Sequence, residues 1–466
     1  MSLRPHRWDV QVVQTTATLS DRLRRLRDVQ LVTKAPRGVP VIHVRDGVLY
    51  QRISGVGGAM TDSAAWLMHE KLKRATRTAL MKDLFSAAGI HLTFIRVPMG
   101  ASDFTVHGEP YSYDDLAPGQ SDPQLLRFSV AHDERYVLPS LRQMLAINPK
   151  AQILANPWSP PPWMKANGAF DDRHFRGTLL PSAYTPLAGY FVKFVQAYAR
   201  RGVPIAAITP QNEPRAPARY PSMSLPVSSE ARFIVRDLAP ALRAAMLSTK
   251  IYGADTAWGA SFYPAQLAAT PARGALSGIA EHCYSGIPDV MSSLHAVDPG
   301  LDQIVSECAP ELTPYSVPEV VIGSIRNWAS AVALWNLALD PSGGPVQPPN
   351  GGCGSCQGLV TINPRAHTFR LSLAYYQLGQ VGRFVQPGAW RIGSEHFVSY
   401  YDRPSGQYGV TAGLDDTAFV NPDGSRVLVA YNNSSAPIRF ALDWKGRSFT
   451  YTLAAGATVT FRWNRP

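Results

Sequence analysis

The stretch VPIAAITPQNEP, residues 203–214, sets an apolar run directly before an amide, a carboxylate and a proline. The run from Val203 to Thr209 is typical of a short buried strand. Glu213 therefore follows a strand end, beside Asn212. A second glutamate, Glu307, ends a similar run that begins at Leu301. Two glutamates at two strand ends indicate acid/base chemistry on a sugar bond, and the alternative is a pair of unrelated surface glutamates.

Working outward from this stretch, strand-like and helical segments alternate over some 320 residues. The strand-like runs are residues 91–97, 152–155, 205–209, 250–253, 278–282, 303–306 and 332–336, and helical spacing appears in 75–88, 187–200 and 229–247. This alternation predicts a parallel sheet closed into a (β/α)8 TIM barrel over residues 51–380. An open doubly wound sheet is the alternative. Its nucleotide-binding signature is only weakly approached, by residues 55–58, which lack the glycine spacing and a clean preceding strand.

Both ends of the chain differ from this central part. Residues 381–466 contain short apolar runs at 397–401, 427–431, 438–442 and 458–462, separated by turn sequences such as Asn421-Pro422-Asp423-Gly424. Residues 1–50 also contain strand-like runs, at 10–16 and 41–44. We therefore expect an α/β protein with a β-sandwich side domain formed by both chain ends, 1–50 and 381–466.

Composition limits the partners of the protein. The net charge of +11 favours acidic surfaces, but the densest basic run, residues 22–27, is short, contains leucines and is typical of a solvated helix face or turn. We expect no nucleic-acid partner. The sequence contains no run of 18 apolar residues, so we expect no integral membrane segment. Residues 1–8 lack the apolar core of a signal peptide, so we expect a secreted or extracytoplasmic protein whose signal lies outside this sequence, with a cytoplasmic protein as the alternative.

The four cysteines do not have the spacing of a zinc site. Cys353 and Cys356 lie in a loop rich in glycine and proline, where a small disulfide or two idle thiols are expected. Cys283 and Cys308 are expected near the mouth of the barrel as packing residues.

Polar and aromatic residues follow successive strand-like runs, at the face of a barrel where chemistry takes place. Aromatic rings stack on the apolar face of a pyranose, while amides and acids bind its hydroxyls. The residues placed in this way are Arg96, Asp103, Trp158, Asn212, Glu213, His282, Tyr284, Glu307, Trp335 and Asn336.

The chain resembles glycoside hydrolase family 30, which includes glucosylceramidase and related β-glucanases and xylanases. The matching stretches are residues 55–62, 95–104, 156–165, 208–214, 220–223, 282–284, 306–308 and 335–341. The resemblance implies that Glu213 is the general acid/base and Glu307 the nucleophile. It places Asp103, Trp158, Asn212, Tyr284 and Trp335 around the reacting sugar, with Arg96 below it and His282 nearby.

The resemblance implies a retaining β-glycoside hydrolase, acting on β-glucosidic bonds of a carbohydrate or glycolipid. A xylanase-type enzyme and a catalytically silent carbohydrate-binding protein are the alternatives. No metal or organic cofactor is required. Family members often have tryptophan where this chain has Cys283. The smaller side chain either widens the wall beside the leaving group or faces into the barrel wall.

Overall fold

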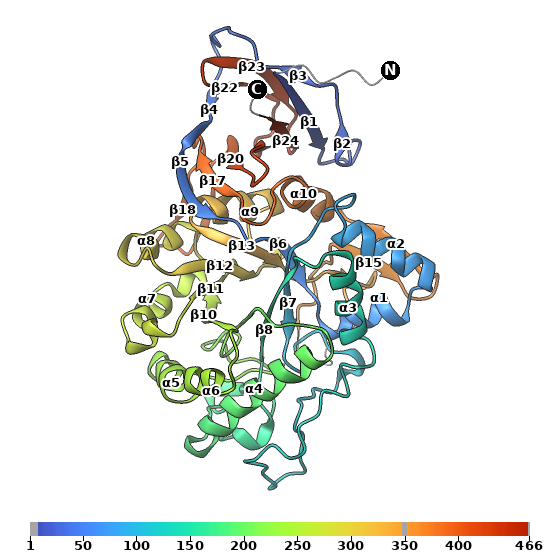
Figure 1. Cartoon of the computed structure of the whole chain (residues 1–466), viewed down its shortest axis with the longest axis vertical. Coiled ribbons are helices and arrows are strands. Elements are labelled where there is room, and N and C mark those ends of the chain that lie inside the picture. Colours follow the sequence, from blue (N-terminus) through green and yellow to red (C-terminus); the bar gives the residue numbers. More distant parts are fainter. Residues whose placement is uncertain (1–7, 347–351, 465–466) are drawn as a thin grey trace.

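The computed structural model describes residues 8–346 and 352–464. Eight parallel strands close into a barrel in the order β10-β11-β12-β13-β6-β7-β8-β9 (Figure 1). The strands are β6 (Gly55–Ala59), β7 (Phe94–Pro98), β8 (Gln152–Asn156), β9 (Ala207–Ile208), β10 (Lys250–Ala257), β11 (Gly278–His282), β12 (Asp302–Glu307) and β13 (Ala329–Leu334). The TIM barrel predicted from the strand–helix alternation is confirmed.

Helices surround the barrel, and at least one follows each strand (Figure 1). They are α1 (Asp62–Glu70), α2 (Arg74–Phe85), α3 (Val137–Ile147), α4 (Tyr184–Arg200), α5 (Val227–Phe233), α6 (Ala239–Ala244), α7 (Phe262–Ala268), α8 (Asp289–Val297), α9 (Val317–Arg326) and α10 (Leu373–Gly382). The apolar side chains of α4 show why such segments form helices. Leu187, Phe191, Phe194 and Tyr198 recur at helical spacing and are all buried in the core.

The first barrel strand, β6, is absent from the strand-like runs of the sequence because it is mostly glycine. It lies between β13 and β7, where the backbones approach closely. A Cβ on Gly57 would overlap the carbonyl oxygen of Phe94, and a Cβ on Gly58 would lie 3.0 Å from the carbonyl oxygen of Leu334. Residues 55–58 are therefore glycine-rich because of barrel packing rather than because of a bound phosphate.

The second unit is a β-sandwich to which both chain ends contribute. One sheet has the order β2-β1-β24-β21-β20-β17-β5, with β3 on β1, and the other has the order β23-β22-β4. Its strands are β1 (Asp9–Thr15), β2 (Arg24–Arg25), β3 (Val29–Gln30), β4 (Val41–His43), β5 (Arg45–Arg52), β17 (Trp390–Gly393), β20 (Leu414–Val420), β21 (Arg426–Asn432), β22 (Ile438–Trp444), β23 (Arg447–Leu453) and β24 (Thr458–Trp463). The antiparallel pairing of β1 with β24 joins the two ends. The exact boundaries at residues 50 and 380 stay predictions.

Some segments differ from the sequence-based expectation. Arg24 and Arg25 form the exposed edge strand β2 instead of a helix face or turn. The run 397–401 yields β18 (Tyr400–Asp402), which pairs only with β19 (Tyr408–Val410) and lies outside the two sandwich sheets. A further small sheet, β14 (Ala338–Leu339), β15 (Val360–Asn363) and β16 (Thr368–Leu371), follows the barrel.

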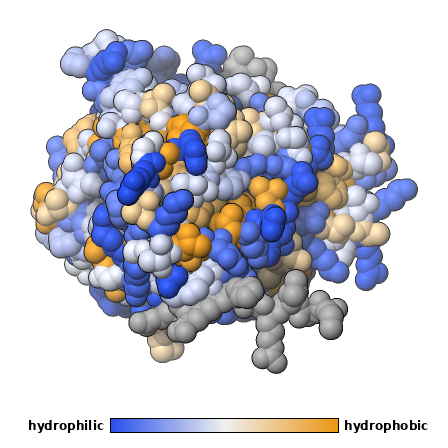
Figure 2. Space-filling view, turned by 90° about the horizontal axis from the view of Figure 1, so that it is seen from above, coloured by the Kyte–Doolittle hydropathy of each residue, from blue (hydrophilic) through white to orange (hydrophobic). Residues whose placement is uncertain are grey.

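The surface at the sandwich end is largely hydrophilic. Figure 2 shows that hydrophobic side chains on this face form small patches separated by hydrophilic ones. Within the described residues, no helix is long and apolar enough to cross a membrane.

Candidate active site

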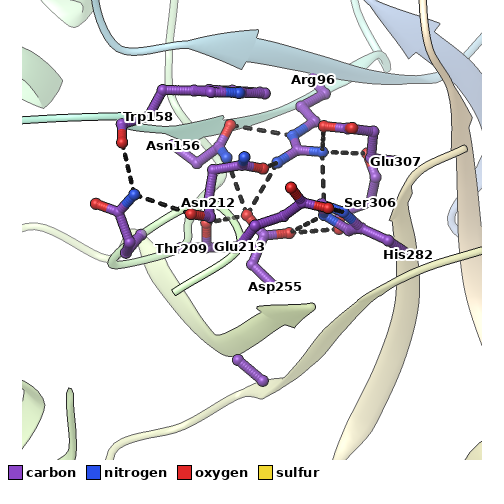
Figure 3. A network of polar contacts seen from close by, with 12 residues as sticks. Arg96, Asn156, Trp158, Thr209, Asn212, Glu213, Asp255, His282, Ser306 and Glu307 are labelled. Carbon is purple, nitrogen blue, oxygen red and sulfur yellow. Dashed lines mark hydrogen bonds and ion pairs between the residues drawn. The ribbon is translucent and has the colours of Figure 1, made fainter. Parts of the chain in front are cut away.

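The carboxyl ends of the barrel strands bring the two glutamates of the sequence analysis into one polar network (Figure 3). Glu307 is the last residue of β12, and Glu213 lies five residues beyond the end of β9. Arg96 on β7 and His282 at the end of β11 lie between them and bind carboxylates. Of the ten residues proposed for the site from sequence, nine lie at or beyond the carboxyl ends of barrel strands, and Arg96 lies in the middle of β7.

Arg96 is the centre of this network, and its side chain is fully buried. Its Nη1 donates to Glu307 Oε2 at 2.5 Å, and its Nη2 donates to Asn212 Oδ1 at 2.7 Å and to Asp255 Oδ2 at 2.9 Å. Its Nε donates to Asn156 Oδ1 at 3.0 Å. The planar guanidinium fixes several acceptors at once, which a lysine ammonium could not do with the same geometry.

Asp255 was not identified in the sequence analysis. It lies in β10 at a register shift between Ala254 and Thr256, and both it and Ala254 have positive φ. Such a bulge re-aims a side chain, and here the carboxylate binds Arg96, His282 and the hydroxyls of Thr209 and Ser306. Burial alone would raise the pKa of Asp255, but Arg96 and His282 hold it well below its usual range. A carboxylate close to an apolar strand-like run, as with Glu213, is the sequence signal that could have identified Asp255.

Glu213 and Glu307 differ in exposure. The Glu213 side chain is 19% exposed and that of Glu307 is 7% exposed. Glu213 has φ of 42°, a conformation that non-glycine residues adopt at a cost and that clusters at active sites. Its backbone N–H donates to the carbonyl of Asp255, and its Oε1 lies 3.2 Å from His282 Nδ1. The network therefore holds Glu213 at the solvent side and Glu307 deeper.

His282 is buried among carboxylates. Its Nε2 lies 3.0 Å from Asp255 Oδ1. Burial lowers the pKa of His282, but Glu307, Asp255 and Glu213 together raise it to about 9. The imidazole is therefore a cation at neutral pH, and both of its nitrogens donate.

Glu307 is held through both oxygens. Tyr284 Oη donates to Oε1 at 2.6 Å, opposite the Arg96 contact to Oε2. Burial is the largest influence on its pKa and raises it, Glu213 also raises it, and Arg96, His282 and Tyr284 oppose the increase. The pKa of Glu307 lies above its ordinary value.

Other residues proposed for the site from sequence lie around this pair. Trp158 and Trp335 stack with ring centroids 5.0 Å apart, and the Arg96 guanidinium lies 4.8 Å from the Trp158 ring. Asp103 is buried, its Oδ1 has no hydrogen-bond partner, and burial with the nearby charges of Glu307 and Glu213 raises its pKa well above the usual range. A protonated Asp103 can donate to a sugar hydroxyl. Tyr220, which the sequence analysis did not single out, is nearby: burial and the negative charges of Glu213, Asp103 and Glu307 raise its pKa well above the usual range.

The expectation for Cys283 and Cys308 as simple packing residues was wrong. They form a disulfide with Cα atoms 5.2 Å apart, and both are fully buried. Cys283 therefore provides no free thiol that widens a wall beside the leaving group. Cys353 and Cys356 also form a disulfide, which was one of the two alternatives for that loop.

In the described parts of the chain, no group of three or more His, Cys, Asp or Glu side chains could hold a metal ion. Comparisons with known proteins agree with the barrel and the sandwich. Residues 53–295 match the glycosyl hydrolase family 30 TIM-barrel domain, and residues 388–461 match the glycosyl hydrolase family 30 beta sandwich domain.

Two curated relatives illustrate the range of similar sequences. An endo-1,6-beta-D-glucanase of Neurospora crassa is 34% identical over 403 residues, covering 85% of this chain and 82% of the relative. The lysosomal acid glucosylceramidase of Mus musculus is 28% identical over 452 residues, covering 89% of this chain and 82% of the relative.

Solved structures of similar proteins superpose over nearly the whole chain. The endo-beta1,6-glucanase BT3312 has a TM-score of 0.84 at 29% identity, and SrfJ from Salmonella typhimurium has a TM-score of 0.87 at 26% identity. Each comparison covers 98% of this chain and 100% of the other.

The barrel, the sandwich and these matches define a glycoside hydrolase. The chain belongs to glycosyl hydrolase family 30.

Proposed function

We propose that the protein is a retaining β-glycoside hydrolase in which Glu213 is the general acid/base and Glu307 is the nucleophile. The observation that carries this proposal is the Arg96–His282–Asp255 network, which holds one glutamate at the solvent side and the other deeper. A retaining enzyme needs one carboxyl group to protonate the leaving oxygen and another to attack the anomeric carbon.

In the first step, Glu307 Oε attacks the anomeric carbon as the glycosidic bond breaks, and Glu213 gives its proton to the leaving oxygen. Arg96 and Tyr284 hold Glu307 through its two oxygens and so fix its direction. The cationic His282 and Arg96 favour the ionised carboxylate against the cost of burial.

In the second step, Glu213 accepts a proton from water, and the water attacks the glycosyl–enzyme ester to release the sugar and regenerate Glu307. Two inversions give net retention. The greater exposure of Glu213 suits this step because water and the leaving group both reach the site from solvent.

The reacting sugar would lie against the stacked pair of Trp158 and Trp335, beside Asp103. Stacked indoles offer an apolar face to the C–H side of the ring, while Asn212 and a protonated Asp103 bind hydroxyls. Asn212 is held by Arg96 at 2.7 Å, which orients its amide nitrogen away from the guanidinium.

The substrate we propose first is a β-1,6-glucan. Three fungal relatives of 34–35% identity are named endo-1,6-beta-D-glucanases, whereas the mouse glucosylceramidase is 28% identical. Glucosylceramide is the second candidate because that relative covers 89% of this chain. The xylanase structures are under 25% identical and carry no argument for xylan.

We also propose that the protein acts in an oxidising, extracytoplasmic compartment. The support is chemical: two disulfides are present, one of them buried beside the site. Such bonds persist mainly outside the reducing cytoplasm.

The test combines a substrate panel with three variants. Glu307→Gln should lose turnover of an aryl β-glucoside. Glu213→Ala should keep the first step with a good leaving group, stall in deglycosylation, and yield a β-glycosyl azide when azide is added. Glu70→Gln, on α1 with 46% of its side chain exposed, is the matched control and should retain full activity. An α-glycosyl azide would contradict retention by this pair, and release of oligosaccharides from β-1,6-glucan but not from xylan would support the substrate assignment.

A further inference from the structure

The disulfide between Cys283 and Cys308 lies directly beside the residues that hold the proposed nucleophile. Cys308 follows Glu307 in sequence, and Cys283 separates His282 from Tyr284. Both half-cystines are fully buried. The cross-link is therefore bonded directly to backbone segments that carry His282, Tyr284 and Glu307.

The strand pairing explains why a cross-link is useful here. β11 and β12 pair in regular register from Gly278 opposite Asp302 to Glu281 opposite Val305. The register then shifts, so that His282 lies opposite Glu307, and both strands end. Cys283 and Cys308 are the next residue on each strand. The disulfide therefore continues the ladder covalently where backbone pairing has become irregular and stops.

The residues beyond this point make the contacts that orient Glu307. Tyr284, directly after Cys283, donates its hydroxyl to Glu307 Oε1 at 2.6 Å. The carbonyl of Tyr284 accepts a hydrogen bond from Tyr408 at 2.7 Å. On the other strand, the carbonyl of Cys308 accepts from the backbone N–H of Trp335 at 2.7 Å. The cross-link thus joins the tyrosine, the glutamate and one wall of the sugar site.

We propose that the Cys283–Cys308 disulfide is a positioning cross-link that holds Tyr284 against Glu307 and so sets the orientation and ionisation of that carboxylate. This inference rests on the proposed role of Glu307. Without the bond, the segment after β11 could rotate relative to the end of β12, and the tyrosine would release Oε1. The rate of attack would fall, and Glu307 would hold its proton to higher pH.

Other charged or titratable groups near Glu307 also influence its pKa, so the pH dependence of activity has contributions from these groups as well as from Tyr284. They are Arg96 from β7, Asp103 from the segment after β7, Glu213 and Tyr220 from the segment after β9, and His282 and Tyr284 from β11 and its extension. Asp255 from β10 acts on Glu307 through Arg96 and His282. Because Cys283 is joined to the cationic His282 as well as to Tyr284, Tyr284→Phe is needed as a separate variant to isolate the contribution of the tyrosine.

A double-mutant cycle tests this. Cys283→Ala/Cys308→Ala and Tyr284→Phe should each lower kcat on an aryl β-glucoside about ten- to hundredfold with little change in KM, and each should move the acidic limb of kcat/KM upward. The triple variant should be no slower than the slower parent, because both changes remove the same contact. Leu442→Ala, in the sandwich core, is the control: it should lower the melting temperature but leave the acidic limb unchanged.

The outcome that overturns the proposal is a cysteine variant that behaves like Leu442→Ala, with a lower melting temperature and an unchanged kcat and acidic limb. Losses that multiply in the triple variant would also overturn it. If the cysteine variant does not fold, reduction of the intact chain replaces it, in a Cys353→Ser/Cys356→Ser background that leaves one disulfide. A water-soluble phosphine with one water converts the disulfide into two thiols and becomes the phosphine oxide.

Thiol counting by mass after alkylation then shows when the bond has opened. A proportional loss of kcat with an upward acidic limb supports the proposal, and full activity of the reduced protein refutes it. Failure of the proposed function would appear differently, as activity that survives Glu307→Gln in the oxidised protein.

Discussion

Replacing Arg96 by methionine removes the buried guanidinium that joins Glu307 to Asp255 (Figure 3). Arg96 and Asp255 are fully buried, so the change leaves two carboxylates without the guanidinium that joins them and with His282 as their remaining cationic neighbour. Removing one partner of a buried ion pair costs about 3–5 kcal/mol. With an unfolding entropy of about 1 kcal/mol per kelvin for 466 residues, the melting temperature should fall by about 3–5 °C.

The effect on catalysis is larger and depends on pH. Arg96 is the strongest of the groups that lower the pKa of Glu307 against the effect of burial. A hydrogen bond to a charged group contributes about 1.5–3 kcal/mol, and 1.36 kcal/mol corresponds to one pH unit. In the proposed mechanism Glu307 must be ionised to attack, so the acidic limb of kcat/KM should move up by about one to two pH units in Arg96→Met.

Arg96→Lys separates charge from geometry. It keeps the positive charge but cannot reach Glu307, Asn212 and Asp255 together. We expect its acidic limb to stay near that of the wild type while kcat falls. Rates on an aryl β-glucoside between pH 3 and 8, with melting temperatures at each pH, provide the measurement. An unchanged acidic limb in Arg96→Met would refute the assignment of Arg96 as the group that keeps Glu307 ionised.

Three further changes test the fold and its electrostatics. Gly57→Ala should prevent folding because its Cβ would overlap the Phe94 carbonyl oxygen, whereas Gly47→Ala should fold normally because its Cβ would meet no atom within 4 Å. Circular dichroism of both variants is the measurement, and a folded Gly57→Ala protein would contradict the packing argument. Phe461→Ala, in the sandwich core, should destabilise by about 3–5 kcal/mol without changing the pH profile of activity, and an altered profile would show that the sandwich acts on the site. The pKa of His282 is raised to about 9, so its contribution to stability should be complete below pH 6.5 and be lost as pH rises through about 9. The melting temperature should therefore fall more between pH 6.5 and 9 in the wild type than in His282→Gln, and an equal fall in both proteins would contradict this.

Much of the fold follows from local sequence patterns. Segments such as 278–282 and 303–306 have strand length, contain short apolar runs and end in polar residues, so both the strands and the polar residues at their ends could be predicted directly. Each of these patterns arises because a given residue is either buried or exposed in its own strand or helix. Parallel strands with intervening helices can then pack into only a few architectures, and the barrel is one of them. The two glutamates were accessible for the same reason, since each follows a strand.

The features that the sequence did not predict are those that depend on how closely separate strands approach each other. Gly55–Ala59 looks unlike a strand because its glycines are selected by the backbones of β7 and β13 on either side. Asp255 has no local signal beyond its position, because a bulge in β10 turns it toward Arg96. The Cys283–Cys308 bond likewise requires two strand ends, 25 residues apart in sequence, to meet at 5.2 Å. Sequence by itself determined the strands, the helices and the chemistry at their ends, because these depend on neighbouring residues along the chain. Only the closed barrel decided the network around Glu307, because a guanidinium, an imidazole and a phenol hydroxyl can act on one carboxylate only when separate strands bring them close to it.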